Sequence, residues 1–222
     1  MHLYGCIFSW YLFCMFTGLI EDIGCIKNIK STPDGKILDV EVNFDTKEVK
    51  IGDSIAINGA CQTVIKIEGK ILTFEAMNET IRRTNFSNLK NGELVNVERA
   101  MKLNSRLDGH LVSGHIDTTS KLAETKKDGV ATIFKFECDT DLIIEKGSIS
   151  INGISLTVSN VDSNYFEVSI LPHTLKNTNL KHLKQNDLVN IEYDMIAKYI
   201  QKFATPKKES KITKEFLIEN GF

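Results

Sequence analysis

The sequence predicts an all-β fold of two similar small domains in tandem, followed by a helix. The first observation behind this prediction is an internal repeat: residues 54–64 read SIAINGACQTV, and residues 148–158 read SISINGISLTV, 94 positions later. The second is the alternation of apolar and polar residues that half-buried strands show. A repeat of this length is a whole domain rather than a solenoid unit. A ligand site in one half therefore predicts a related site in the other.

The repeat extends over most of the chain. Residues 16–21, FTGLIE, match residues 112–117, VSGHID, and the two-residue change in offset fits a loop of unequal length. Downstream, the offset of 94 is kept by four pairs: Thr80 with Thr174, Asn85 with Asn179, Leu94 with Leu188 and Asn96 with Asn190. We expect a first domain at residues 15–110, a second at residues 111–195, and an oligomerisation helix and tail at residues 196–222.

Strand and turn signals follow in the same order in each half. Leu38, Val40, Val42 and Phe44 alternate with polar residues, and residues 65–67 and 71–74 flank a hairpin turn, as do residues 158–161 and 165–170. Asn58-Gly59 and Asn152-Gly153 predict turns, because both residue types tolerate the positive φ of a type I′ turn. A small closed barrel suits each half best, since closure leaves no exposed sheet edge. A two-sheet sandwich is the alternative.

After Asp194 the apolar period becomes that of a helix. Ile196, Tyr199, Ile200 and Phe203 form one apolar stripe, and we expect Pro206 to end the helix nearby. Because the stripe lies outside both repeats, we expect it to form an oligomer seam. The alternative is that it packs on its own barrel.

The composition is that of an ordinary globular chain. Of its 222 residues, 42% are hydrophobic and 25% charged, and the formal net charge is −2. This argues against a nucleic-acid partner, which favours a clustered basic face, and we expect the lysines of residues 207–214 to be solvated surface. The five cysteines form no Cys-x-x-Cys pair. We therefore expect no disulfide framework, no metal site and a reducing, cytoplasmic setting.

The first fourteen residues stand outside the repeat. They are apolar and contain no Lys or Arg, so they lack the basic region of a secretory signal. They are also shorter than the about 20 apolar residues that span a bilayer. Because Met15 opens the repeat, we expect a start assigned too far upstream. A membrane-associating extension is the alternative.

Positions at which the halves differ, within matching surroundings, are the candidates for chemistry. Leu19 corresponds to His115, Cys61 to Ser155, and Gln62 to Leu156. His115 could exchange a proton near neutral pH, although a histidine beside a glycine is more often structural. These differences predict two ligands that are bound alike but treated differently.

Hydroxyl and thiol groups are also paired along the strands. Ser155 and Thr157 project to one face of a strand, as do Cys61 and Thr63. Such pairs are either solvent-facing residues or hydrogen-bond partners of a polar ring. Cys61 is either a small buried residue or a reactive thiol.

Several motifs resemble those of the riboflavin synthase alpha chain, in the lumazine-binding tandem-barrel family. They are, in order, residues 15–21 (MFTGLIE), 58–64 (NGACQTV), 96–100 (NVERA), 109–115 (GHLVSGH) and 152–158 (NGISLTV), and the likeness runs from Met15 to about Phe203. The resemblance implies two six-stranded antiparallel β-barrels per chain and a homotrimer held by the C-terminal helix.

The resemblance also implies an activity, that of the last step of riboflavin biosynthesis. Two molecules of 6,7-dimethyl-8-ribityllumazine would be dismutated by transfer of a four-carbon unit, giving riboflavin and 5-amino-6-(D-ribitylamino)uracil. Each barrel would bind one lumazine, and the active site would pair the first barrel of one subunit with the second barrel of its neighbour. No metal or redox cofactor is implied, because the substrate ring is itself the electron sink.

The site residues carried over from the family fall into three sets. Residues tied to turnover correspond to Phe16, Ser54, Cys61, His115, Ser155, Thr157 and Asp194. The first ligand is expected to meet Gly18, Leu19, Ile20, Cys61, Gln62, Thr63, Glu75, Ala76, Met77, Asn78, Glu79 and Thr80. The second is expected to meet Gly114, His115, Ile116, Lys146, Ser155, Leu156, Thr157, Ser169, Ile170, Leu171, Pro172, His173 and Thr174.

The match has three departures and two rivals. Ala60, Gln62 and Asp108 stand where relatives carry cysteine, leucine and glycine, and none of them removes an expected catalytic residue. One rival is a non-catalytic antenna protein of the same superfamily, which binds a lumazine or flavin and lets the second site decay. The second half here keeps its site residues, which favours the enzyme. An unrelated barrel interaction module is disfavoured by the number of motifs. Some relatives dock their trimer inside a lumazine synthase shell, and the resemblance suggests this shell as a partner.

Overall fold

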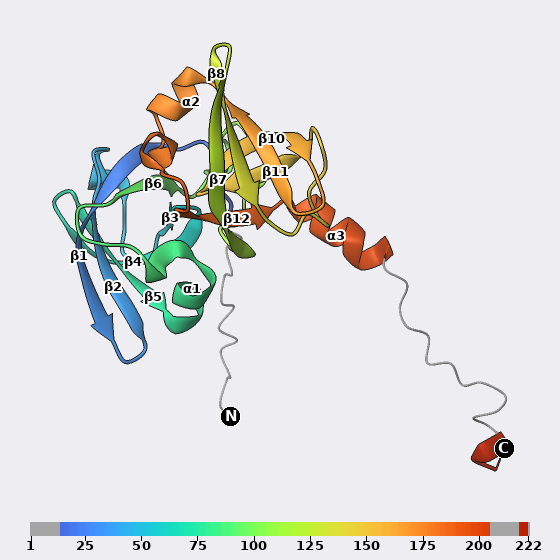
Figure 1. The fold of residues 1–222 in the computed structure, drawn as a ribbon. Coiled ribbons are helices and arrows are strands. Elements are labelled where there is room, and N and C mark those ends of the chain that lie inside the picture. The colour runs from blue at the N-terminus through green and yellow to red at the C-terminus, as the bar shows by residue number, and fades with distance from the viewer. Residues whose placement is uncertain (1–13, 205–217, 222) are drawn as a thin grey trace.

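The structure is a computed structural model that describes residues 14–204 and 218–221. Two closed antiparallel barrels of six strands each follow one another along the chain, and a single helix extends from the second barrel (Figure 1). This confirms the predicted fold class and excludes the sandwich. The expectations for residues 1–13, for Pro206 and for the Lys-rich tail lie outside the described residues.

The first barrel closes in the strand order β1-β2-β5-β4-β3-β6. Its strands are β1 (Asp22–Thr32), β2 (Gly35–Glu41), β3 (Ser54–Ile57), β4 (Ala60–Glu68), β5 (Ile71–Met77) and β6 (Leu94–Arg99). Helix α1 (Asn78–Arg83) follows β5, and 3-10 turns lie at Thr46–Glu48 and Asn85–Ser87. The predicted hairpin is formed by β4 and β5.

The second barrel repeats this order as β10-β11-β8-β7-β12-β9 around the ring. Its strands are β7 (Thr118–Asp128), β8 (Ala131–Glu137), β9 (Ser148–Ile151), β10 (Ile154–Val161), β11 (Tyr165–Ile170) and β12 (Leu188–Tyr193). Helix α2 (Pro172–Lys176) and a 3-10 turn at Asn179–His182 correspond to α1 and its neighbour. The internal repeat is thus a repeat of structure.

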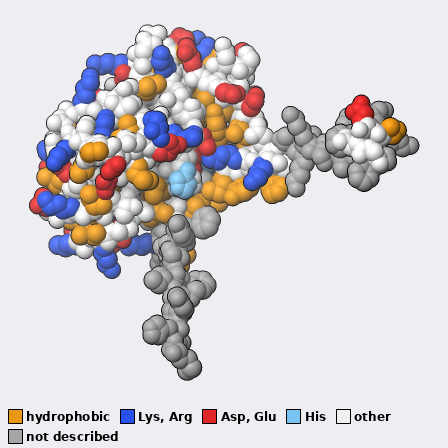
Figure 2. Space-filling model, turned by 90° about the horizontal axis from the view of Figure 1, so that it is seen from below, with side chains coloured by type: hydrophobic (Ala, Val, Ile, Leu, Met, Phe, Trp, Pro, Cys, Tyr) orange, Lys and Arg blue, Asp and Glu red, His pale blue; other side chains and the backbone are white. Residues whose placement is uncertain are grey.

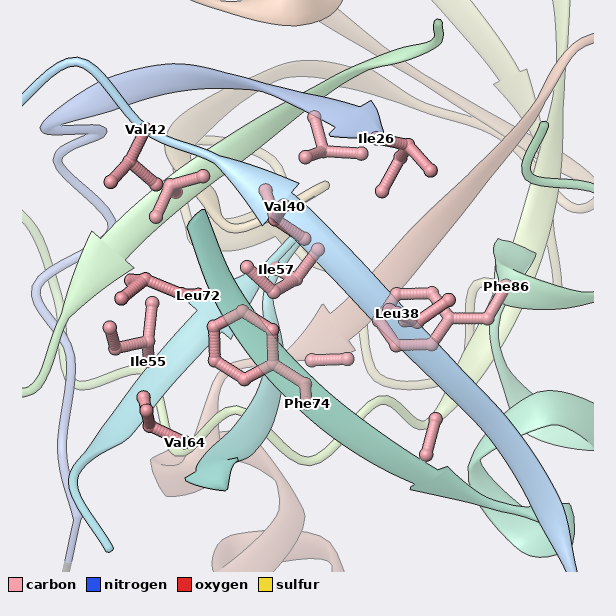
Figure 3. Close-up of a cluster of buried hydrophobic side chains, with 14 of the residues drawn as sticks. Ile26, Leu38, Val40, Val42, Ile55, Ile57, Val64, Leu72, Phe74 and Phe86 are labelled. Carbon is pink, nitrogen blue, oxygen red and sulfur yellow. The ribbon is translucent and has the colours of Figure 1, made fainter. Parts of the chain in front are cut away.

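Each barrel is filled mainly by apolar residues of its own strands. Figure 3 shows Leu38 and Val40 on β2 pointing into the first barrel with Leu72 and Phe74, and all four side chains are fully buried. Burying each such side chain contributes about 1.5–3 kcal/mol. The strand β2 ends at Glu41, earlier than the alternation suggests, but Val42 remains in the core.

The two barrels are joined back to back through their Asn-Gly turns. Asn58 and Asn152 both have φ of 46°, as the predicted turns require. A Cβ atom on Gly59 would lie only 2.5 Å from the backbone nitrogen of Gly153. Buried asparagines cross this contact: Nδ2 of Asn96 donates to the Asn152 carbonyl at 2.9 Å, and Nδ2 of Asn190 donates to the Asn58 carbonyl at 2.8 Å. The turns therefore fix how one barrel sits on the other.

Helix α3 (Met195–Ala204) leaves the second barrel with its apolar stripe uncovered. Ile196, Tyr199, Ile200 and Phe203 are 61%, 55%, 62% and 81% exposed. Figure 2 shows hydrophobic side chains gathered along the lower edge, where this helix departs from the body of the molecule. The alternative that the stripe packs on its own barrel is wrong for this chain. Across residues 14–204 and 218–221, no helix is long and apolar enough to cross a membrane.

Candidate active site

Two short segments, residues 16–20 and 112–116, cross between the barrels. The Phe16 nitrogen donates to the Val112 carbonyl at 2.8 Å, and the Val112 nitrogen donates back at 3.1 Å. The Phe16 side chain is fully buried in a small cluster with Ala56 and Val112. Phe16 thus lies between the barrels rather than at a surface open to a ligand, and it positions the two segments.

Beyond this pair, each segment lies on the barrel of the other half. The Gly18 carbonyl accepts a hydrogen bond from the Ser155 nitrogen at 2.8 Å, and Ile20 packs on the core of the second barrel. In the same way, the Gly114 carbonyl accepts from the Cys61 nitrogen at 2.9 Å, and Ile116 is part of the first core.

This crossing corrects the expected grouping of site residues. Residues 18–20 lie with Ser155, not with Cys61, and residues 114–116 lie with Cys61, not with Ser155. Sequence order suggests that a segment belongs to the barrel that follows it. The antiparallel contact of Phe16 with Val112 carries each segment across to the other barrel instead.

Glycine is required at the point where each segment meets its strand. Gly18 and Gly114 have φ of 77° and 79°, a region that side chains rarely adopt. A Cβ atom on Gly18 would lie 2.5 Å from Cβ of Ser155, and one on Gly114 would lie 2.6 Å from Cβ of Cys61. The glycines of the Thr-Gly and Ser-Gly pairs therefore let the backbone come close to the two candidate nucleophiles, Ser155 and Cys61.

The second-barrel site centres on Ser155. Its Oγ atom lies 2.6 Å from Nδ1 of His110, a half-buried residue of the loop that precedes residues 112–116. Burial lowers the pKa of His110, and the nearby carboxylate of Asp194 opposes this effect. Neutral His110 can accept the hydroxyl proton of Ser155. Ser155, His110 and Asp194 are far apart in the sequence but lie close together in the fold.

Thr157 lies farther along the same strand, β10, and Lys146 lies against this strand. On β10, Ile154 and Val158 are buried, whereas Thr157 on the other face is exposed, as the alternation predicted. The Lys146 nitrogen donates to the Val158 carbonyl at 2.9 Å. Lys146 has φ of 63°, and its repeat counterpart is Gly52. This backbone conformation is costly for a lysine, which supports a functional role for the exposed side chain of Lys146.

The first-barrel site centres on Cys61. Its thiol is hydrogen-bonded to Cys14 and to Ser54. The contact with Cys14 and burial raise the pKa of Cys61, and the hydrogen bond with Ser54 opposes this effect. Cys61 is therefore a neutral thiol and not a ready thiolate. His115, which follows Gly114, is exposed above this site. The structure thus places Ser54, Cys61 and His115 around the first barrel, and Ser155, Thr157 and Asp194 around the second.

The remaining expected contact residues form matching segments at the ends of β5 and β11. Strand β4 pairs with β5 up to Val64 and Phe74, so Glu75 follows directly beside Thr63. Strand β10 likewise pairs with β11 at Val158 and Val168, next to Ser169. Both segments continue into α1 and α2, and most of their side chains are exposed. Ala76 and Ile170, which point inward, are buried exceptions, and Gln62 on β4 is buried as well.

Three functional candidates were not predicted from the sequence: His110, Glu98 and Glu192. Glu98 and Glu192 are nearly fully buried at the same repeat position of β6 and β12. Burial raises the pKa of both carboxyls, to about 7 for Glu98, against the effect of their hydrogen bonds. A signal was present, since an acidic residue recurs inside two apolar strands. For His110 no spacing pointed to Ser155.

The chain is similar in sequence to known proteins. A model of the lumazine binding domain matches the chain twice, at residues 17–100 and 113–194. The riboflavin synthase of Actinobacillus pleuropneumoniae is 41% identical over 215 residues, which cover 94% of this chain and 100% of that protein. The chain belongs to the riboflavin synthase family. Its resemblance to the alpha chain of this family is thereby confirmed.

Further relatives support the riboflavin synthase family assignment. The riboflavin synthase of Bacillus subtilis (strain 168) is 38% identical, with the same coverage of 94% and 100%. The solved structure of LumP complexed with riboflavin superposes with a TM-score of 0.73 at 24% identity, covering 80% of this chain and 98% of that one. This structural likeness concerns the fold.

Proposed function

We propose that this protein is a riboflavin synthase, a transferase that converts two molecules of 6,7-dimethyl-8-ribityllumazine into riboflavin and 5-amino-6-(D-ribitylamino)uracil. The observation that carries the proposal is the asymmetry of two homologous sites. One presents the neutral thiol of Cys61, and the other presents Ser155 with His110. This asymmetry suits a dismutation, in which two identical molecules are bound alike and then play different parts.

The residues of the two sites suit the proton transfers that the reaction needs. The acidic 7-methyl group of one lumazine loses a proton, and the resulting carbanion is held against the ring of the other. His110, through Ser155, can take and return a proton in the second site. His115 is available for this in the first. The ring systems themselves act as electron sinks, and the two products contain all the atoms of the two substrates.

Alignment of the two rings provides much of the acceleration. Holding two reactants in register contributes on the order of 7–11 kcal/mol in well-oriented reactions. Hence loss of one side chain at either site should lower turnover without abolishing it.

The deciding experiment mixes the purified protein with 6,7-dimethyl-8-ribityllumazine alone and follows riboflavin absorbance. Riboflavin formed at half the molar amount of substrate consumed supports the dismutation. Tight binding without product would favour the antenna protein, and absence of binding would contradict both. The side-chain roles are tested with His115→Ala and Ser155→Ala, with Ser163→Ala in the exposed turn after β10 as the control. If both site variants turned over as fast as the control, these roles would be wrong.

The proposal includes a homotrimer assembled through α3, with each active site shared by two subunits. Its support is the uncovered stripe of Ile196, Tyr199, Ile200 and Phe203. Phe203→Asp should convert trimers to monomers in sedimentation experiments and remove turnover. Lys202→Asp, on the same helix but outside the stripe, should leave both unchanged. A trimer that survives Phe203→Asp with full activity would argue against this seam.

The proposal divides the chain into two domains, at residues 15–110 and 111–195.

The proposal also includes a cytoplasmic location and a protein partner. The location is supported by the five cysteines, which are scattered and form no Cys-x-x-Cys pair. The partner is a lumazine synthase shell, and co-elution of the two purified proteins in size-exclusion chromatography tests this.

A further inference from the structure

Glu98 on β6 and Glu192 on β12 are equivalent carboxylates of the two barrels. Only 3% and 1% of their surfaces are exposed. A buried carboxylate costs stability unless it is well hydrogen-bonded. Packing of the barrel core therefore does not explain why both halves have a buried glutamate at this position.

Both carboxylates bind the crossing segments in the same way. The Oε1 atom of Glu98 accepts from the nitrogen and the hydroxyl of Thr17, at 2.6 and 2.7 Å, and its Oε2 atom accepts from the Gly18 nitrogen at 3.1 Å. The Oε1 atom of Glu192 accepts from the nitrogen and the hydroxyl of Ser113, at 2.7 and 2.6 Å, and its Oε2 atom accepts from the Gly114 nitrogen at 2.9 Å. Each carboxylate thus fixes a segment at three points.

The fixed segment does not belong to the ligand site of the carboxylate's own barrel. Gly18, held by Glu98 of the first barrel, bonds to Ser155 of the second at 2.8 Å. Gly114, held by Glu192 of the second barrel, bonds to Cys61 of the first at 2.9 Å. Two chains of contact therefore run across the molecule, from β6 to β10 and from β12 to β4.

We propose that Glu98 and Glu192 are positioning residues that act across the barrels, Glu98 on the second-barrel site and Glu192 on the first. The identity of the ligands rests on the proposed function, whereas the positioning does not. Each glutamate fixes the position of a glycine whose carbonyl is hydrogen-bonded to the strand of Ser155 or of Cys61. The competing explanation is that both carboxylates only hold the two halves together, in which case removal of either would disturb both sites alike.

Two histidines serve as reporters of the two sites. His110 contacts Ser155 through its side chain, and its nitrogen donates to the Thr17 carbonyl at 3.2 Å, so it reports on the second site. His115 follows Gly114, and its nitrogen donates to the Ser113 hydroxyl at 3.3 Å, so it reports on the first. The experiment records NMR spectra of the full-length protein with ¹³C-labelled histidine. His110→Gln and His115→Gln variants assign the two resonances.

The test variants are Glu98→Gln and Glu192→Gln, each the matched control of the other. Glutamine keeps the shape and one acceptor oxygen but puts an NH₂ group where the second oxygen accepted from glycine. Glu98→Gln should shift the His110 resonance and leave that of His115 in place, and Glu192→Gln should do the reverse. Equal shifts of both resonances in both variants, or no shift in either, would overturn the proposal.

Milder variants keep the test decisive if a glutamine variant does not fold. Thr17→Val and Ser113→Ala each remove one hydroxyl donor from a carboxylate, and they should give smaller shifts in the same crossed pattern. In turnover, each glutamine variant should lose roughly tenfold in kcat/KM, because small displacements of a positioned group are costly. The spectra need no turnover. If the shifts are crossed but the protein makes no riboflavin, the positioning role stands and the proposed function is wrong. If the protein makes riboflavin but the shifts are not crossed, the proposed function stands and the positioning role is wrong.

Discussion

The Nδ1 atom of His110 lies 2.6 Å from the Oγ atom of Ser155. Strand β10 carries Ser155, and His110 comes from the loop between the barrels. Burial keeps the pKa of His110 below its usual value, so near neutral pH the imidazole is uncharged and can accept the serine proton. In the first half the equivalent positions hold Cys14 and Cys61, whose thiols are hydrogen-bonded to each other. The contact of His110 with Ser155 is the clearest chemical difference between two sites of common origin.

We predict that Ser155→Ala and His110→Gln lower kcat by similar factors, at most about 10²-fold, which is the lower end for general acid–base groups. If the two act as one unit, the double variant should be no slower than the slower single variant. Steady-state kinetics of the three variants measures this. Additive losses would mean that the two side chains act independently.

Gly18→Ala and Gly114→Ala should reduce turnover strongly. Each new Cβ atom would overlap Ser155 or Cys61, at 2.5 and 2.6 Å, in addition to the about 1–2 kcal/mol for a side chain in the left-handed region. Gly92→Ala is the control, because Gly92 has φ of 88° and nothing within 4 Å of its added Cβ. In thermal unfolding, all three variants should lose the stability that a side chain in the left-handed region costs, and Gly18→Ala and Gly114→Ala should lose more than Gly92→Ala. Full activity of Gly18→Ala would contradict the close contact with Ser155.

The fold could be predicted from the sequence to a large extent, because its determinants are local. Alternation at Leu38 and Val40 and the Asn58-Gly59 turn act within a few residues, and the repeat showed that whatever one half forms, the other forms too. Contacts set by the chain as a whole could not be predicted. The pairing of Phe16 with Val112 carries each segment to the opposite barrel, and no local pattern encodes that exchange.

The same distinction holds within the site. Cys61 and Ser155 could be found because the repeat aligns them and they differ. His110 aligns with Cys14 in the repeat, but its role depends on a contact with Ser155 across 45 positions of sequence. Glu98 did lie within a motif, but its motif gave no indication that its hydrogen bonds go to Thr17 and Gly18.

Lys146→Gly should stabilise the protein and weaken ligand binding. The backbone of Lys146 lies in the left-handed region at φ of 63°, which costs a non-glycine residue on the order of 1–3 kcal/mol. The side chain is exposed, so little packing is lost. We expect a higher midpoint of thermal unfolding together with a higher KM for the lumazine. Lys146→Ala separates the two effects, since it removes the amine and keeps the strained backbone.

Glu98→Gln should make stability less dependent on pH. Because burial raises the pKa of Glu98 from 4.5 to about 7 in the folded state, this residue favours folding most below pH 4.5. Its contribution is then lost as pH rises through about 7. The difference between the two pKa values corresponds to about 3 kcal/mol. Glutamine carries no charge at any pH. Raising the pH from 5 to 8 should therefore lower the free energy of unfolding less in Glu98→Gln than in the wild type.

Urea unfolding at pH 5 and at pH 8 measures this difference, with Glu68→Gln at the exposed end of β4 as the control. The expected result is a variant that is at least as stable as the wild type at pH 8 and yet slower in turnover. That combination would follow if the charge of Glu98 serves to hold Thr17 and Gly18 in place rather than to hold the barrel together. A variant that loses stability equally at both pH values would show instead that the ionised carboxylate is not strained by its burial.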